Sequence, residues 1–285
     1  MSAGPCALRV VAIAMAGIVL GGAMPAHAAD TPPGNPDTIE VNALRKPEVR
    51  KYAAIVAGLD AFERHRAMAP NVDALRFQIE PRGAAREHAP AYPEALTARL
   101  EGDGGFVLQL YPAADGSLTV PRSDDALDAR SELLLNRKRR DYRIVPMVRT
   151  PGLPPHVRRL GDLRLECQVT VAIGKEEVGT LRTLFVNSLL LTSDWCAFFN
   201  AERDGFTYAT PHPVVSATMR EGERSRMLQH EGRSFRTPLN DPAWSDDALV
   251  ELVFAPSSAD AAGEPAPQVG GAPTGTAAEM LRTGP

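Results

Sequence analysis

The sequence predicts a mainly β protein of β-sandwich-like architecture with one amphipathic helix near the N-terminus, and an α+β fold is the alternative. Three observations carry this prediction. Apolar and polar residues alternate in several short runs between residues 71 and 148, turn-forming glycines separate these runs, and residues 163–173 alternate without interruption. Because successive side chains of a strand point to opposite faces, this pattern is typical of sheets with one buried face.

The first expected element is a helix that begins at Pro47 and ends before Pro70. Proline suits a first helical position because the N–H that it lacks would have no partner there. The apolar residues that follow recur at helical spacing and would form one packing face. These residues are Tyr52, Ile55, Val56, Leu59 and Phe62.

Glycine turns between short apolar runs predict consecutive antiparallel hairpins. After an alternating strand at 75–80, the run GDGG separates an expected strand at 95–101 from one at 106–111, and the dipeptide DG precedes another at 118–121. The segment DGSLTVP, which contains this last turn, resembles the turn and strand of transthyretin-like and carboxypeptidase-regulatory-like domains. The resemblance covers this segment alone, so it supports a sandwich and identifies no family.

A further strand pair is expected at 132–138 and 142–148, joined by a tight charged turn. Pro146 should keep the second of these strands at a sheet edge, because proline cannot donate a ladder hydrogen bond. The strand at 163–173 would place Cys167 on its buried face. Residues 176–191 fit either a helix or a strand. Further strands are expected at 206–210, 213–219, 225–236 and 248–255.

The N-terminus predicts export. Arg9 is followed by an apolar run from Val10 to Met24, and Ala26 and Ala28 supply the small residues of a signal-peptidase site. The run is shorter than the ~20 residues that span a bilayer, so we expect cleavage before Ala29 and a periplasmic or secreted protein. Cleavage would remove one cation and no anion, which changes the formal net charge from −4 to −5.

The terminal segments are rich in proline, glycine and small or polar residues, which cannot bury enough apolar surface to offset the entropy of ordering. TPGLPP, residues 150–155, is the best internal boundary. We therefore expect a signal peptide at 1–28, a flexible segment at 29–46, a helix with a small β-sandwich domain at 47–150, a second mainly β domain at 151–255 and a disordered Ala/Gly/Pro-rich tail at 256–285.

Two cysteines, Cys167 and Cys196, remain after cleavage, and an even pair in an oxidising compartment predicts a disulfide bond. The alternative for Cys196 is a nucleophile activated by His212 or His230.

Metal and catalytic motifs are missing from the sequence. Past the signal peptide, no two histidines lie three to five residues apart and there is no Cys-x-x-Cys; the pair His230-Glu231 is followed by Ser234 where a zinc-protease motif requires a second histidine. We find no Gly-x-Ser-x-Gly and no phosphate-binding glycine loop. The sequence therefore predicts no metal and no cofactor.

Positive charge is concentrated in residues 130–164, which contain ten cations and three anions. Two groups of these cations could bind an anionic ligand if the fold brings them together; the alternative is a solvated turn paired with neighbouring acids. The candidate residues are Arg137, Lys138, Arg139, Arg140, Arg158 and Arg159.

The combined features favour an exported, non-catalytic, envelope-associated binding or accessory protein over an enzyme. Its expected partner is an anionic envelope component or another envelope protein. The mildly negative net charge gives no indication of nucleic-acid binding, and no transmembrane segment is expected after cleavage. The alternative is a periplasmic hydrolase with a site near Asp194, His212 and His230.

Overall fold

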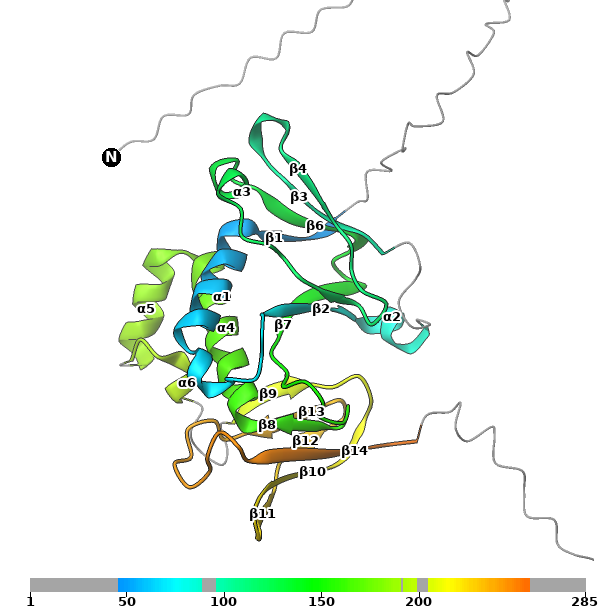
Figure 1. Ribbon diagram of the computed structural model, residues 1–285, viewed down its shortest axis with the longest axis vertical. Coiled ribbons are helices and arrows are strands. Elements are labelled where there is room, and N and C mark those ends of the chain that lie inside the picture. The colour runs from blue at the N-terminus through cyan, green and yellow to red at the C-terminus, as the bar shows by residue number, and fades with distance from the viewer. Residues whose placement is uncertain (1–45, 89–95, 191, 199–204, 257–285) are drawn as a thin grey trace, which may run out of the picture. The chain divides into compact units, whose positions relative to one another are not determined.

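Four small antiparallel sheets and a set of helices make up the described part of the chain in the computed structural model (Figure 1). A mixed or mainly β fold is therefore confirmed, whereas the sandwich arrangement stays a prediction. No helix within the described ranges is long and apolar enough to cross a membrane. The predicted signal peptide, nearly all of the N-terminal segment and nearly all of the C-terminal tail lie outside these ranges. The structure describes residues 46–88, 96–190, 192–198 and 205–256.

The first sheet has the strand order β1-β6-β3-β4. Its strands are β1 (Pro47–Lys51), β6 (Glu132–Lys138), β3 (Ala98–Glu101) and β4 (Val107–Leu110). The predicted hairpin between β3 and β4 is confirmed. Gly104 and Gly105 make this turn possible because both adopt positive φ angles, +68° and +80°.

The second sheet has the order β5-β2-β7, with β5 (Ser117–Leu118), β2 (Arg76–Pro81) and β7 (Tyr142–Met147). Pro146 lies on an edge strand, as predicted. Two predicted hairpins are wrong, because β5 pairs with β2 rather than β4, and β6 pairs with β1 and β3 rather than β7. The charged turn after β6 exists, but it passes the chain from one sheet to another.

The predicted helix start at Pro47 is also wrong, because residues 47–51 form β1 and the helix α1 spans Tyr52–Arg64. Lys51 remains extended, and the backbone N–H of Tyr52 donates to Ser131 O at 2.9 Å. The predicted apolar face is present, with Tyr52, Ile55 and Phe62 fully buried.

The strand predicted at 163–173 is wrong, because these residues lie inside the helix α4 (Leu160–Val178). At about 100° per residue, an alternating pattern over several turns places apolar side chains on two opposite helix faces. One face carries Leu163 and Cys167, and the other carries Leu165, Val169 and Ile173. The alternation therefore reflects a helix that is buried on two sides.

Each face of α4 packs into a different apolar core. One core contains the inner faces of α1 and the first two sheets, and the other contains side chains from the sheets of the second half. Helices α1 and α4 lie side by side (Figure 1), and Gly58 permits their close approach because a Cβ there would lie 2.8 Å from Ile173 Cγ1. The division into two domains at residue 150 stays a prediction, since α4 contributes to both cores.

The second half forms two sheets, with the orders β11-β10-β14-β8 and β12-β13-β9. The strands expected at 206–210, 213–219 and 248–255 are confirmed, and the run 225–236 is divided into three strands. The elements are β8 (Val157–Arg159), β9 (Phe206–Ala209), β10 (Val214–Glu221), β11 (Arg224–Met227), β12 (His230–Glu231), β13 (Ser234–Thr237) and β14 (Leu249–Phe254).

The remaining elements are helical. The ambiguous residues 176–191 form the end of α4 and the helix α5 (Thr180–Leu190), apart from residue 191, which is not described. Cys196 lies on the short helix α6 (Trp195–Phe198) and is joined to Cys167 by a disulfide with a Cα–Cα distance of 6.1 Å, so the predicted pairing is confirmed. The short helices are η1 (Arg66–Met68), α2 (Gly83–His88), η2 (Asp103–Gly105), α3 (Asp124–Asp128) and α6 (Trp195–Phe198).

Candidate functional site: a basic corner

The charged turn after β6 lies between two other backbone segments that also carry cations. On one side, the backbone N–H of Arg139 donates to Lys46 O at 3.1 Å. On the other side, the backbone N–H of Arg82 donates to Asp141 O at 2.7 Å, and its guanidinium donates to Arg139 O at 3.4 Å. Residues from three distant parts of the sequence thus meet at one place, between the ends of β6 and β2 and the start of β1 (Figure 1).

The cations of this turn are exposed and only weakly neutralised. The side chains of Arg139 and Arg140 are 76% and 77% exposed. Arg139 lies 3.9 Å from the buried carboxylate of Glu48, and Arg140 lies 3.3 Å from Asp141. Glu48 also lies closer to Arg50, at 3.5 Å, and the pair of Arg140 with Asp141 is a surface pair, which contributes little. Both guanidinium groups therefore keep most of their capacity to bind an anion.

Helix α2 adds a further cation beside the turn. Burial lowers the pKa of Arg86; Glu80 acts in the opposite direction, and the nearby guanidinium groups of Arg143, Arg233 and Arg82 lower the pKa further. Glu80 is already engaged by two hydrogen bonds from Arg143, at 2.8 and 2.6 Å. The neighbourhood of Arg86 therefore has a surplus of positive charge.

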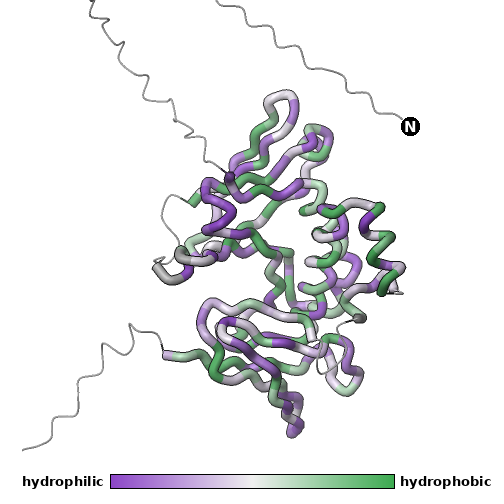
Figure 2. Tube along the Cα trace, turned by 180° about the vertical axis from the view of Figure 1, so that it is seen from behind, coloured by the Kyte–Doolittle hydropathy of each residue, from purple (hydrophilic) through white to green (hydrophobic). Residues whose placement is uncertain are grey.

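We call this surface the basic corner. Figure 2 shows the same part of the chain from behind, near α2, with a strongly hydrophilic tube. Its members differ in burial: Arg86 is half-buried, and the other five are exposed. The members of the basic corner are Lys46, Arg82, Arg86, Lys138, Arg139 and Arg140.

Arg137, which was predicted with this group, is half-buried near the end of β6, where its guanidinium donates to Asn136 O at 2.8 Å. Arg82, Arg86 and Lys46 were missed by the sequence analysis. They lie far from the turn in the sequence, and only the pairing of β1 with β6 and the return of the chain after β2 place them beside it.

Arg158, also predicted for anion binding, performs a structural task. Its guanidinium donates to Glu166 Oε2 at 2.9 Å and to Val148 O at 3.0 Å, and Glu166 also accepts the N–H of Val148 at 2.9 Å. Burial raises the pKa of Glu166, although Arg158 and the Val148 N–H act in the opposite direction. This buried pair ties the segment after β7 to helix α4.

Arg159 is engaged in the same way at the start of α4. It is 9% exposed and donates to Asp247 Oδ1 at 3.0 and 2.8 Å and to Met68 O at 2.5 Å. The contacts of Arg158 and Arg159 come from α4, from the segment after β7, from the end of η1 and from the loop before β14. None of these contacts involves the turn after β6.

The three residues of the hydrolase alternative have other contacts. Asp194 Oδ1 accepts from the backbone N–H groups of Cys196 and Ala197 at 3.0 and 3.2 Å, so its carboxylate orders the start of α6. The His212 ring lies 5.7 Å from the Phe254 ring, and His230 is exposed on β12. Within the described ranges, no hydrogen bond or ion pair joins Asp194 to either histidine.

Cys196 has no free thiol in this structure, because the disulfide with Cys167 engages it and both residues are buried. The geometry therefore gives no support to a Cys–His nucleophile. In the described part of the chain, no group of three or more His, Cys, Asp or Glu side chains could hold a metal ion.

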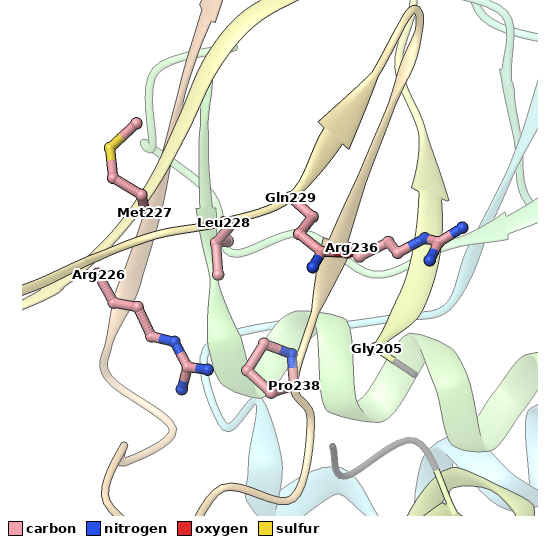
Figure 3. A pocket seen from close by; sticks show the side chains of 7 residues that line it. All are labelled: Gly205, Arg226, Met227, Leu228, Gln229, Arg236 and Pro238. Atoms are coloured by element: carbon pink, nitrogen blue, oxygen red, sulfur yellow. The ribbon is translucent and has the colours of Figure 1, made fainter. Parts of the chain in front are cut away.

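Two pockets lie elsewhere in the described part of the chain, and Asp194, His212 and His230 line neither. The first, of about 190 Å³, is lined by Arg226 and Arg236 near Pro238. In Figure 3 their guanidinium groups point in different directions, and Arg226 is held by Asp241 at 3.0 Å.

The second pocket, of about 250 Å³, mixes cationic Arg76 and Arg149 with Asp73 and Asp115. Arg149 donates to the carbonyl oxygens of residues 153 and 154. Neither pocket presents a convergent set of reactive side chains, which leaves the basic corner as the strongest candidate site.

Comparison of the chain with protein-family models, with curated proteins and with solved structures returns no match. The function must therefore be inferred from the residues of this chain.

Proposed function

We propose that this protein is an exported, non-catalytic binding or accessory protein of the cell envelope that holds an anionic envelope component at its basic corner. One observation carries the proposal. A chain with a formal net charge of −4 gathers six cations from three separate segments on one corner, and five of the six are exposed. Such a local surplus attracts anions even when the whole molecule is negative.

The chemistry of the corner defines the ligand class. Arginine presents planar donors that match phosphate and carboxylate oxygens, and the corner contains four arginines. An extended surface of exposed cations suits a polymer or a membrane headgroup layer better than a small molecule, which would require an enclosed pocket. The ligand we propose is therefore a phosphate- or carboxylate-bearing envelope polymer or lipid headgroup.

The predicted export signal supports a location in the cell envelope. The apolar run and the small residues before Ala29 are typical of a signal peptide, and the Cys167–Cys196 disulfide suits an oxidising compartment. A periplasmic or secreted protein with an anion-binding surface would meet anionic lipids and cell-wall polymers. Mass spectrometry of the exported protein should find Ala29 as its first residue.

The test is retention on anionic material at physiological salt. Wild type should bind vesicles that contain phosphatidylglycerol and should not bind phosphatidylcholine vesicles. A parallel measurement adds soluble glycerol phosphate as a competitor. It distinguishes binding to the phosphate headgroup itself from binding that requires an assembled membrane surface. Each cation near an anionic surface contributes about 1 kcal/mol, so changing four of them should weaken binding by roughly 100-fold or more. The variant carries serine at Arg82, Lys138, Arg139 and Arg140.

The control removes the same charge elsewhere. Four exposed arginines away from the corner, each in one surface ion pair, are changed to serine, and binding should remain within about threefold of wild type. Equal losses in both variants would show that net charge rather than the corner determines binding, and would contradict the proposal. The control residues are Arg66, Arg122, Arg130 and Arg220.

A further inference from the structure

Helix α5 presents its apolar side chains to solvent. None of its residues is buried, and Leu181, Leu184, Phe185 and Leu189 are 83%, 57%, 66% and 67% exposed. Their spacing of three and four residues places them on one face of the helix, with Ser188 between them. We call these five residues the α5 stripe. Figure 2 shows the hydrophobic stretches on this outer helix.

The opposite face of α5 makes the contacts with the rest of the protein. Asn187 Oδ1 accepts from Trp195 Nε1 at 2.7 Å, and Thr183 Oγ1 donates to Lys175 O at 3.2 Å. At about 100° per residue, Thr183 and Asn187 lie on the side of the helix away from Phe185. The half-buried Val186 and Leu190 lie on the same inner face, so α5 is apolar on both sides, and its four most exposed apolar side chains face outward.

The orientation of α5 is fixed at both ends. Gly179, with φ of +83°, separates α5 from α4. After α5, Trp195 packs beneath Lys175 at 5.0 Å, and the neighbouring Cys196 is linked to Cys167 on α4. The stripe is therefore held outward by specific contacts. Contiguous exposed apolar surface of this kind marks interaction sites.

We propose that the α5 stripe is the interface at which two copies of this chain associate around a two-fold axis. The exposed fractions correspond to roughly 500 Å² of apolar surface per copy, taking about 150 to 200 Å² for a fully exposed Leu or Phe side chain. Two copies would bury about 1,000 Å², the area from which specific interfaces begin. An apolar stripe is self-complementary, as a two-fold interface requires.

The charge pattern of α5 also fits a second copy. Arg182 is the single charged residue of α5 and lies beside the stripe. An antiparallel pair centred on Phe185 places Leu181 against Leu189 of the second copy and keeps the two Arg182 side chains apart at opposite ends. A helix that binds a membrane surface carries several Lys or Arg residues on its polar face, whereas α5 carries a single cation and its inner face contacts its own protein.

The experiment is sedimentation velocity of the full chain between about 1 and 100 µM, and wild type should show a concentration-dependent dimer of twice the monomer mass. Leu184→Glu with Phe185→Glu should be monomeric throughout, a loss of at least 100-fold in dimer affinity. The control is Val215→Glu with Met227→Glu, which changes two apolar residues away from the stripe that are 56% and 68% exposed. This variant should dimerise like wild type. Circular dichroism checks that all three are folded.

A cross-linking measurement gives a second test that needs no large change of charge. Phe185→Cys should form an intermolecular disulfide under mild oxidation, and Val215→Cys should not. A wild type that is monomeric at all concentrations would overturn the proposal. If monomers bind phosphatidylglycerol vesicles through the stripe, the proposal would be overturned in favour of a lipid surface. If dimers form only after truncation beyond residue 256, it would be overturned in favour of the C-terminal segment as the occupant of the stripe. Dimerisation is independent of the proposed anion binding, so either can fail alone.

Discussion

Removal of the Cys167–Cys196 disulfide should destabilise the whole described fold rather than α6 alone. The two cysteines are 29 residues apart, and a loop of this length corresponds to about 3.5 kcal/mol in the chain-entropy model. Cys167 is 0% exposed within the core that α4 shares with the second-half sheets. Cys196 is 3% exposed, and its carbonyl accepts from Asn240 Nδ2 at 2.8 Å, which joins α6 to the loop after β13.

The perturbation is the double change Cys167→Ala and Cys196→Ala, because alanine introduces no unsatisfied polar group into the core. The free energy of unfolding should fall by about 3.5 kcal/mol, with about 1 kcal/mol more for lost sulfur packing. For a domain of this size, the total of about 4.5 kcal/mol should lower the melting temperature by roughly 9 to 18 °C. Guanidinium unfolding of the oxidised wild type and of the variant measures the difference.

Two tryptophans make the assay specific, because Trp195 lies on α6 and Trp244 lies in the apolar core. Single-tryptophan variants should report coincident transitions in the wild type. A loss below about 1 kcal/mol, or an early Trp195 transition that leaves the Trp244 transition unchanged, would refute the reasoning. Either result would mean that α6 opens independently of the core, so that the disulfide closes no loop in the cooperative unit.

Two smaller changes test the packing of α1 on α4 and a turn in the second sheet. Gly58→Ala should destabilise by about 1 kcal/mol in thermal unfolding despite its better helix propensity, because its Cβ would meet Ile173 Cγ1 at 2.8 Å and Ile173 Cδ1 at 2.9 Å. Adding Ile173→Val, which removes Cδ1, should recover part of the loss, and additive effects would contradict the Cδ1 contact. The hydroxyl and backbone N–H of Ser117 lower the pKa of Asp115. This contribution to stability is present above the unfolded pKa and is lost as pH falls, so Ser117→Ala should raise the Asp115 pKa in an NMR titration and shift acid unfolding to higher pH; an unchanged pKa would exclude the hydroxyl as its cause.

Local sequence signals predicted individual strands and turns better than they predicted which strands pair with each other. The positive-φ glycines specified the β3–β4 hairpin, and Pro146 was correctly placed at an edge. The pairing of β6 with β1 joins residues more than eighty positions apart, and no turn signal encodes it. Period-two alternation at 163–173 was misleading because two opposite faces of α4 are both buried, a fact that depends on the surrounding cores.

Only part of the candidate site could be predicted from the sequence, because its members come from distant segments of the chain. Arg139 and Arg140 lie in a contiguous charge run that any inspection finds. Arg82 and Arg86 stand in a segment of ordinary composition and become relevant only when the backbone of Arg82 meets Asp141. Local sequence also does not reveal that the guanidinium of Arg158 is engaged by Glu166, eight residues along the chain.

The central claim is that the basic corner, and no other surface, receives the anionic ligand. NMR titration of isotope-labelled protein with dihexanoyl phosphatidylglycerol below its micelle concentration tests this most directly. At physiological salt, the arginine side-chain signals of Arg82, Arg86, Arg139 and Arg140 should shift together, while those of Arg122, Arg130 and Arg220 should stay in place. Shifts spread over all exposed arginines, or confined to residues outside the corner, would contradict the account.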